Sequence, residues 1–230
     1  VPEALWNTIC RESELCSMNK CKYKNTCSYM KARNRWKQAH ILVMNHYLFF
    51  SNIAASKSLV PDYKVVVFDE AHSLERIAAS QLGFAINIQW LKETLEHIIQ
   101  KKKGISHIEQ WLDYSLYQKA IEVFDNALRQ VQICKKACND LIQNLQTLRL
   151  RKPFKEGLPL LKALEEIIGV FESVEAERLE EDIRLEYEYF KSNIMNVCNN
   201  LGMLVFMDDT DYVYWLEKEK SNTNTVIMCG

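Results

Sequence analysis

The stretch Val65-Val66-Val67-Phe68-Asp69-Glu70-Ala71-His72 decides the fold that we expect for this chain. Four consecutive apolar residues, three of them β-branched, are typical of a strand that is buried on both faces of a parallel sheet. Two adjacent carboxylates follow directly, and residues 73–79 are predicted to form a helix. In open α/β sheets, ligands bind outside the carboxyl ends of the strands. The stretch therefore places Asp69 and Glu70 where a nucleotide and its metal ion would bind.

The tetrapeptide at the end of this strand resembles the DEAH form of the Walker B motif, which superfamily-2 helicases carry. In that family the Asp holds Mg²⁺ through its water shell, the Glu polarises the attacking water, and the His couples the nucleotide state to the motor. The resemblance implies these roles for Asp69, Glu70 and His72. Any parallel strand can end in Asp-Glu, so a purely structural interpretation stays open.

Composition sets broad limits on the class of protein. The 230 residues suit one or two domains, and 48% hydrophobic with 26% charged residues is ordinary for a soluble protein. The sequence contains no apolar run long enough to cross a bilayer, and we expect no signal peptide. Eight cysteines in such a chain favour reduced thiols and metal ligation over disulfides. We therefore expect a cytoplasmic protein.

The net charge of −1 conceals an uneven distribution. Residues 1–60 contain nine Lys and Arg against three Glu, whereas residues 156–190 contain eleven acidic residues against three basic ones. A basic portion beside an acidic helical one fits contact with nucleic acid at one end only, although charge alone is equally compatible with a merely solvated surface.

Four cysteines lie close together near the N-terminus, at Cys10, Cys16, Cys21 and Cys27, separated by five, four and five residues. The residues between them are too polar to build a core, so a metal is the expected organiser. Zinc sites usually contain paired CxxC knuckles, which this segment lacks. The wider spacing favours an iron–sulfur cluster, with zinc and unligated surface thiols as the alternatives.

A basic segment follows the cysteines. Residues 29–39 are predicted to form a helix with a basic face and interleaved aromatic side chains, a composition that suits phosphate contacts and base stacking. Residues 40–44 then predict a short strand and residues 45–50 a helix, so that this strand, the helix and the strand at 65–68 form a βαβ unit with parallel pairing. The candidate DNA-binding residues are Lys31, Arg33, Arg35 and Lys37.

The order of these motifs resembles the iron–sulfur superfamily-2 DNA helicases of the bacterial DinG type, which are related to XPD. In that family a 4Fe–4S domain lies between the Walker A and Walker B motifs, and a helical arch domain follows the Walker B strand. The resemblance implies that Cys16, Cys21 and Cys27 are cluster ligands. The fourth ligand of the family usually lies well upstream, which would put it before Val1, and Cys10 is the one local candidate.

The resemblance implies four regions: a cysteine-rich cluster region at 1–38, a part of motor domain 1 at 39–82, a helical arch at 83–210, and a return to motor domain 1 at 211–230. We thus expect an α/β motor fragment with parallel strands and two insertions, mostly helical overall. Cys134 and Cys138 fall on an apolar helical stripe, where core thiols are favoured over metal ligands. Two strands are predicted at 212–217 and 225–228.

Two motor elements are missing from the 230 residues. No glycine begins a GxxxxGK(S/T) loop, and nothing resembles a second motor domain. We expect a portion of an ATP-dependent 5′–3′ helicase that acts in repair or replication at the bacterial nucleoid, with ATP, Mg²⁺, single-stranded or forked DNA and the remainder of its own chain as partners. Alone it should not hydrolyse ATP. The alternative is a zinc-stabilised helical module that binds protein.

Overall fold

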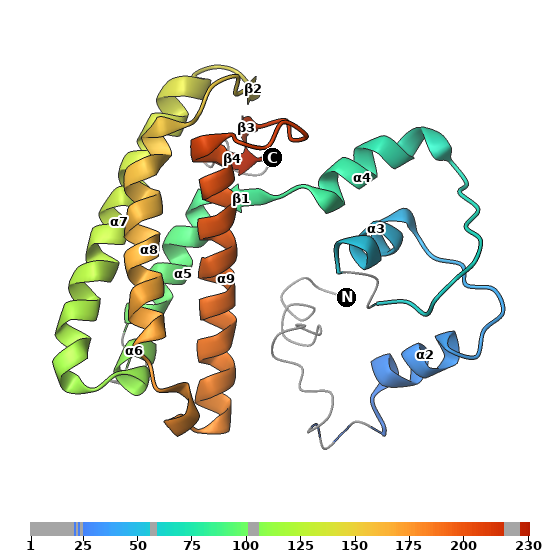
Figure 1. Cartoon of the computed structure of the whole chain (residues 1–230), viewed down its shortest axis with the longest axis horizontal. Coiled ribbons are helices and arrows are strands. Elements are labelled where there is room, and N and C mark those ends of the chain that lie inside the picture. Colours follow the sequence, from blue (N-terminus) through green and yellow to red (C-terminus); the bar gives the residue numbers. More distant parts are fainter. Residues whose placement is uncertain (1–20, 22, 24, 56–58, 101–105, 219–225) are drawn as a thin grey trace. The chain divides into compact units, whose positions relative to one another are not determined.

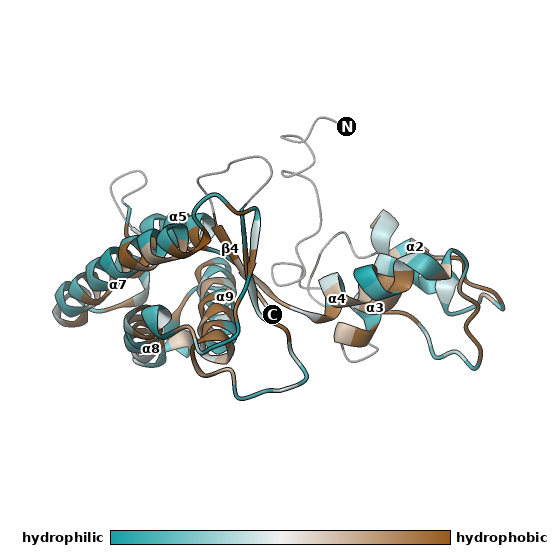
Figure 2. Cartoon of the chain, turned by 90° about the horizontal axis from the view of Figure 1, so that it is seen from above, coloured by the Kyte–Doolittle hydropathy of each residue, from teal (hydrophilic) through white to brown (hydrophobic). Residues whose placement is uncertain are grey.

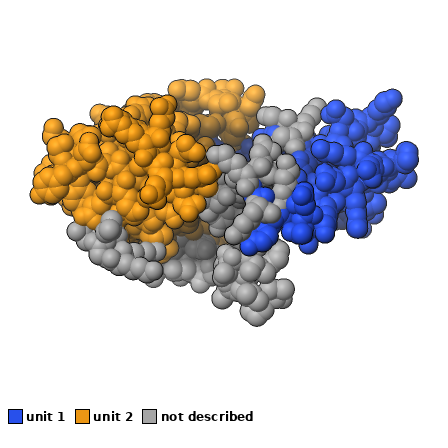
Figure 3. Space-filling model, turned by 90° about the horizontal axis from the view of Figure 1, so that it is seen from below, with its two compact units in different colours: residues 1–84 blue, residues 85–230 orange. Residues whose placement is uncertain are grey.

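The structure is a computed structural model that describes residues 21, 23, 25–55, 59–100, 106–218 and 226–230. The chain divides into two compact units, unit 1 (Val1–Phe84) and unit 2 (Ala85–Gly230), which Figure 3 shows in different colours. Most of the described residues are helical, as the sequence predicts. Each unit is described by itself below.

Unit 2 is a bundle of long helices (Figure 1). Helix α5 spans Ile88–Ile99, α7 spans Tyr114–Ile142, α8 spans Leu158–Glu172 and α9 spans Glu181–Phe206. A short helix α6 (His107–Trp111) lies between α5 and α7, and the 3₁₀ turns η2 (Lys155–Gly157) and η3 (Ala176–Arg178) precede α8 and α9. The end-on view of Figure 2 shows apolar residues facing the interior of this bundle.

The bundle forms because each helix carries apolar residues three and four positions apart. The buried set includes Phe124, Val131, Ile142, Leu164, Phe171, Tyr187, Ile194 and Leu201. The Tyr187 hydroxyl donates a hydrogen bond to the Phe171 carbonyl at 2.8 Å, so this buried polar group is satisfied. Asn87 caps α5 by accepting hydrogen bonds from the backbone of Gln89 and Trp90, which fixes where that helix begins.

A small antiparallel sheet closes one end of the bundle. The strands are β1 (Ala85–Asn87), β2 (Thr147–Arg149), β3 (Trp215–Lys218) and β4 (Val226–Cys229), in the order β1-β4-β3-β2. Leu216 of β3 lies opposite Met228 of β4, and both are fully buried. The two C-terminal strands that the sequence predicts are therefore present, and they pair with strands that belong to unit 2.

Unit 1 contains α2 (Ser28–Trp36), α3 (His46–Ala54), the 3₁₀ turn η1 (Ala71–Ser73) and α4 (Leu74–Leu82). The helices expected after residues 28, 45 and 73 are confirmed. Helix α3 begins at an Asn45 cap, whose side chain accepts a hydrogen bond from the Leu48 backbone at 2.8 Å. The sequence also predicts a short helix at residues 2–12, with Pro2 near its start, and this segment lies outside the described residues.

The predicted parallel strands at 40–44 and 65–68 require correction. Neither segment is a strand in the described part of the chain, where every strand pair is antiparallel and lies in unit 2. A strand is held by hydrogen bonds to a neighbour, and neither segment has one there. Their apolar side chains are instead exposed: Val43 by 96% and Val67 by 90%.

Among the described residues, no helix combines the length and the apolar character that a membrane span requires.

Candidate functional site

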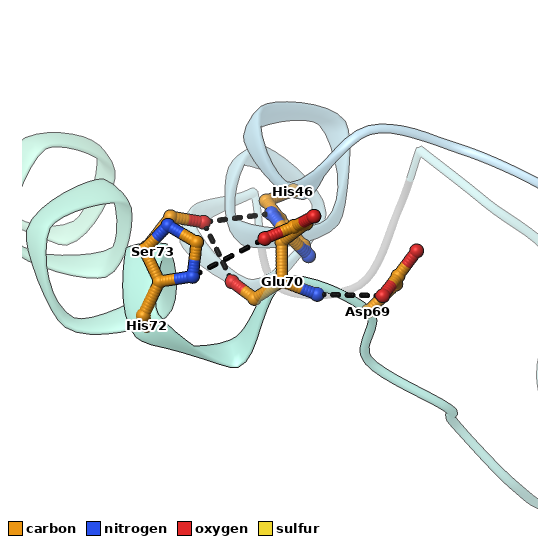
Figure 4. A network of polar contacts seen from close by, with 5 residues as sticks. All are labelled: His46, Asp69, Glu70, His72 and Ser73. Atoms are coloured by element: carbon orange, nitrogen blue, oxygen red, sulfur yellow. Dashed lines mark hydrogen bonds and ion pairs between the residues drawn. The ribbon is translucent and has the colours of Figure 1, made fainter.

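The candidate site is the loop at residues 69–73, between the apolar segment 65–68 and helix α4 (Figure 4). Glu70 has the left-handed backbone conformation (φ 48°, ψ 47°), which is uncommon for a residue with a side chain. Its amide donates a hydrogen bond to Asp69 Oδ1 at 2.9 Å. Backbone strain of this kind concentrates at functional sites, because the surrounding structure must hold it in place.

Ser73 closes the loop. Both its amide and its hydroxyl donate hydrogen bonds to the Glu70 carbonyl, each at 3.0 Å. The same hydroxyl lies 3.4 Å from Nδ1 of His46, the first residue of α3. Helix α3 and the start of α4 thus fix the backbone of Glu70 through one serine.

His72 and Glu70 face each other across the turn. His72 Nδ1 lies 3.2 Å from Glu70 Oε2, which is an ion pair when the imidazole is protonated (Figure 4). Their side chains are 79% and 70% exposed, so solvent and ligands reach both groups. The loop therefore presents two carboxylates and an imidazole within four residues.

Aromatic rings support the loop from the apolar side. The Phe68 ring lies edge-on to the Phe49 ring at 4.9 Å and 6.0 Å from the His46 ring. Phe49 also approaches Tyr63 at 6.0 Å. Helix α3 therefore contacts the segment before Asp69 as well as Ser73 after it.

This arrangement fits a hydrated divalent cation. Carboxylate oxygens and water are the ligands that Mg²⁺ prefers, and Mg²⁺ in nucleotide sites is bound through one or two carboxylates together with substrate phosphates. One oxygen of Asp69 accepts a hydrogen bond from the Glu70 amide, and its other oxygen has no hydrogen-bond donor among the described residues. The donor set of the loop is therefore chemically suited to the metal of a nucleotide site.

Of the three predicted cluster ligands, Cys21 and Cys27 lie within the described residues, and Cys16 lies outside them, as does Cys10. Cys21 is exposed and Cys27 is partly buried. Cys27 is the N-cap of α2. Both thiols suit a soft metal or cluster, although the described residues alone contain no group of three such ligands.

The predicted basic helix is present as α2, which contains Lys31, Arg33 and Arg35 and has Lys37 as its C-cap, but its cations do not share one face. At 100° per residue, Lys31 and Arg35 lie together, while Arg33 lies on the opposite side. Arg33 donates a hydrogen bond to the Leu59 carbonyl at 3.2 Å, so it links α2 to residue 59 within unit 1. Lys31, Arg35 and Lys37 are exposed.

Sequence reasoning missed the residues that join separate segments of unit 1, including two that contact the loop. Asn52 is fully buried, and its side-chain oxygen accepts hydrogen bonds from the Leu59 and Val60 amides at 2.9 and 3.0 Å. A polar residue in the apolar stretch of α3 was the available signal. The roles of His46 and Ser73 depend on contacts between separate segments, which local pattern does not contain.

Comparison with known proteins shows what part of this chain is similar to. The DEAD_2 family model matches residues 4–91, a range that contains the four N-terminal cysteines, α2, α3 and the loop at 69–73. Over this part of its length the chain is therefore similar to the DEAD_2 family.

Individual relatives support the same assignment. The chain is 29% identical over 97 residues to the ATP-dependent DNA helicase YoaA of Escherichia coli K12 and 32% identical over 90 residues to YoaA of Haemophilus influenzae, matches that cover 40% and 37% of this chain. It is 21% identical over 144 residues, 61% of this chain, to the ATP-dependent DNA helicase DinG of Photobacterium profundum. The matched segments cover 15%, 14% and 20% of these relatives.

Proposed function

We propose that this chain is the Walker B, cluster and arch portion of an ATP-dependent DNA helicase of the iron–sulfur DinG type. The observation that carries the proposal is the exposed Asp-Glu-Ala-His loop at 69–72, which falls inside the segment that matches the helicase family. The helicase unwinds forked DNA in the 5′ to 3′ direction during repair or replication.

Each residue of the loop has a role in this proposal. Asp69 holds the hydrated Mg²⁺ of Mg–ATP, Glu70 is the general base that orients the attacking water, and His72 couples the site to the motor. The 3.2 Å contact between His72 Nδ1 and Glu70 Oε2 supports the coupling role, because it joins the two side chains directly. Phosphoryl transfer needs such positioning and charge stabilisation more than covalent catalysis.

The other elements bind the cluster and DNA. Cys16, Cys21 and Cys27 hold a 4Fe–4S cluster, with Cys10 or an upstream cysteine as the fourth ligand, and α2 contacts single-stranded DNA through its basic residues. The remainder of the helicase chain supplies the Walker A loop and the second motor domain. The exposed apolar segments 41–44 and 65–68 support this last point, because they need neighbouring strands to be buried.

The cluster is tested by analysis of iron, sulfide and zinc after anaerobic purification. We expect about four irons and four sulfides per chain, the content of one 4Fe–4S cluster, with a broad visible absorption band. Cys21→Ser should lose the iron, whereas Cys134→Ser, a matched change at a buried thiol of α7, should retain it. One zinc without iron would instead support a zinc-stabilised interaction module.

The nucleotide site is tested by Glu70→Gln. The 230-residue chain should show only background ATP hydrolysis, and a Mg²⁺-dependent rate that Glu70→Gln abolishes would contradict that expectation. In a helicase chain that includes a Walker A loop, Glu70→Gln should lower kcat by about 10²–10⁴-fold, the usual contribution of a general base, with nucleotide binding retained. An unchanged kcat would refute the assignment of Glu70.

A further inference from the structure

Two histidines of unit 2 form a pair that the proposed helicase chemistry does not use. His97 lies in the last turn of α5, and His107 is the first residue of α6. Their Nε2 atoms are 3.3 Å apart, and their ring centroids are 5.0 Å apart at an interplanar angle of 77°. Helix α6 packs against both α5 and α9, so the pair lies where three helices of the bundle meet (Figure 1).

The spacing of the two nitrogens matches that of two ligands on one metal ion. Zn²⁺ binds an imidazole nitrogen at about 2.0–2.1 Å, so two nitrogens on a tetrahedral ion lie roughly 3.4 Å apart. The observed 3.3 Å is close to this value and longer than most hydrogen bonds from N–H donors, which span about 2.7–3.2 Å. The two side chains would therefore need little movement to share one ion.

Glu186 of α9 prepares His107 for this role. Its Oε2 lies 3.1 Å from Nδ1 of His107, a buried atom with no hydrogen-bond partner elsewhere among the described residues. A carboxylate at Nδ1 favours the tautomer that carries its proton there, which leaves the lone pair on Nε2, the atom that faces His97. Histidines that bind metals almost always have such a partner, which fixes the ring and raises its basicity as a ligand.

Aromatic rings hold the pair in its orientation. Phe190 of α9 is buried, and its ring contacts both imidazoles, with centroids 5.8 Å from His97 and 5.5 Å from His107. The Trp111 ring lies 6.0 Å from that of His107. The side chain of His107 is 15% exposed and His97 is partly buried, so the pair is packed in place yet reaches water. Ligands that are already ordered lose less entropy when they bind.

We propose that His97 and His107 bind one divalent transition-metal ion, Zn²⁺ in the first place, and that Glu186 positions His107. Neutral imidazole suits Zn²⁺, Cu²⁺ and Ni²⁺. The described residues contain no group of three side-chain ligands, so water completes the coordination. The ion would join α5 to α6 and, through Glu186, to α9. The site uses neither the loop at 69–73 nor the N-terminal cysteines, so this inference goes beyond the proposed helicase function and does not depend on it.

The test is a Zn²⁺ titration of the purified 230-residue chain, followed by the imidazole ¹⁵N resonances, which report on each histidine separately from the thiols. We expect the Nε2 resonances of His97 and His107 to shift together once the cysteines are saturated. His97→Gln should remove the shift at His107, and His107→Gln should remove it at His97. His40→Gln, the loss of an exposed histidine in unit 1, is the matched control and should leave both shifts in place.

Glu186 provides a graded test of the same site. Glu186→Gln should weaken Zn²⁺ binding about tenfold or more, because loss of a carboxylate that supports a metal ligand typically costs about 10–100-fold in affinity. Glu188→Gln removes the same charge from an exposed position of α9 and should leave the affinity unchanged. Equal affinities of these two variants would refute the role of Glu186.

The remaining outcomes overturn the site itself. Resonances of His97 and His107 that do not move at millimolar Zn²⁺ would identify the pair as hydrogen-bonded only. A shift at one histidine that survives replacement of the other would assign the ion to a different set of ligands. The titration of the unsubstituted chain needs no variant to fold, and circular dichroism of each variant separates loss of Zn²⁺ from loss of structure.

Discussion

The two units differ in how they treat apolar side chains. Unit 2 buries its aromatic residues, with Phe124, Phe171 and Tyr187 no more than 1% exposed. The described part of unit 1 leaves Val65 and Val67 exposed by 78% and 90%. Because burial of apolar area is the dominant stabilising contribution to folding, we expect the buried core of unit 2 to contribute more stability than the exposed apolar residues in the described part of unit 1.

The largest expected effect tests the core of unit 2. Phe171 contacts the rings of Trp111, Phe124 and Tyr187 at 5.8 to 6.4 Å. Phe171→Ala should lower the free energy of unfolding by about 3–5 kcal/mol, the usual cost of removing a buried Phe. Urea denaturation followed by circular dichroism measures it.

The matched change in unit 1 is Val67→Ala. Because Val67 is exposed, this change should alter the free energy of unfolding by less than about 0.5 kcal/mol. A cost for Val67→Ala comparable to that of Phe171→Ala would mean that the contrast between the units is wrong.

A second prediction concerns the buried hydrogen bonds that the Asn52 side chain accepts in unit 1. The Asn52 side chain accepts hydrogen bonds from the Leu59 and Val60 amides while fully buried. Asn52→Ala leaves both donors without this acceptor and should destabilise unit 1 by about 2 kcal/mol. Hydrogen exchange at the Leu59 and Val60 amides measures the lost protection.

Ser51→Ala provides the control for Asn52. It removes one partly buried hydrogen bond, from the Ser51 hydroxyl to Gln81 at 2.8 Å, and should cost about 1 kcal/mol or less. Equal effects of the two substitutions would show that the buried Asn52 side chain stabilises unit 1 no more than the partly buried Ser51 hydroxyl does.

A third prediction uses a buried thiol of unit 2. Burial raises the pKa of Cys229 to about 12, from 9.0, and the charge of Glu217 acts in the same direction. The unfolded chain therefore loses this proton first as pH rises. The stability that the thiol contributes is complete below pH 9 and is lost as pH rises from 9 towards 12.

Urea denaturation at pH 8, 9.5 and 10.5 checks this dependence, because these values lie below and above about 9, the ordinary pKa of a thiol. Cys229→Ala should reduce the rate at which the free energy of unfolding falls with rising pH. The reduction should be less than about 1.4 kcal/mol per pH unit, the limit for one titrating proton. An unchanged slope in Cys229→Ala would mean that other groups account for the whole loss.

The sequence predicts helices better than strands in this chain, for a physical reason. The stripe through Phe124, Cys134 and Cys138 is buried as its spacing predicts, and both thiols are core residues with no more than 1% exposure. A helix satisfies its backbone within its own segment, so local periodicity contains most of the information. Strands depend on neighbours, and β1 and β2, with three residues each, are too short to show alternation.

The candidate site was likewise predictable from the sequence only in part. The motif identified Asp69, Glu70 and His72 from their order alone, and those assignments stay predictions. Nothing local predicted the left-handed conformation of Glu70, because it depends on Ser73 and on His46 from another helix. Sequence reasoning also treated the cations of α2 as one face, whereas the helix separates Arg33 from Lys31 and Arg35.

The smallest expected effect is a change in DNA binding that depends on which unit carries the altered charge. Arg35 is exposed on α2, and its replacement by Glu should weaken binding of oligo-dT a few-fold and lower the salt slope by about 0.7, the value for one phosphate contact on a single strand. Arg129→Glu makes the same charge change on an exposed position of α7 in unit 2 and should leave the slope unchanged, because the proposed phosphate contacts are on α2 and do not include Arg129. Fluorescence anisotropy over a range of salt concentrations measures both slopes. If the two variants behave alike, net charge rather than α2 controls DNA binding, since a specific contact must depend on position and not on charge alone.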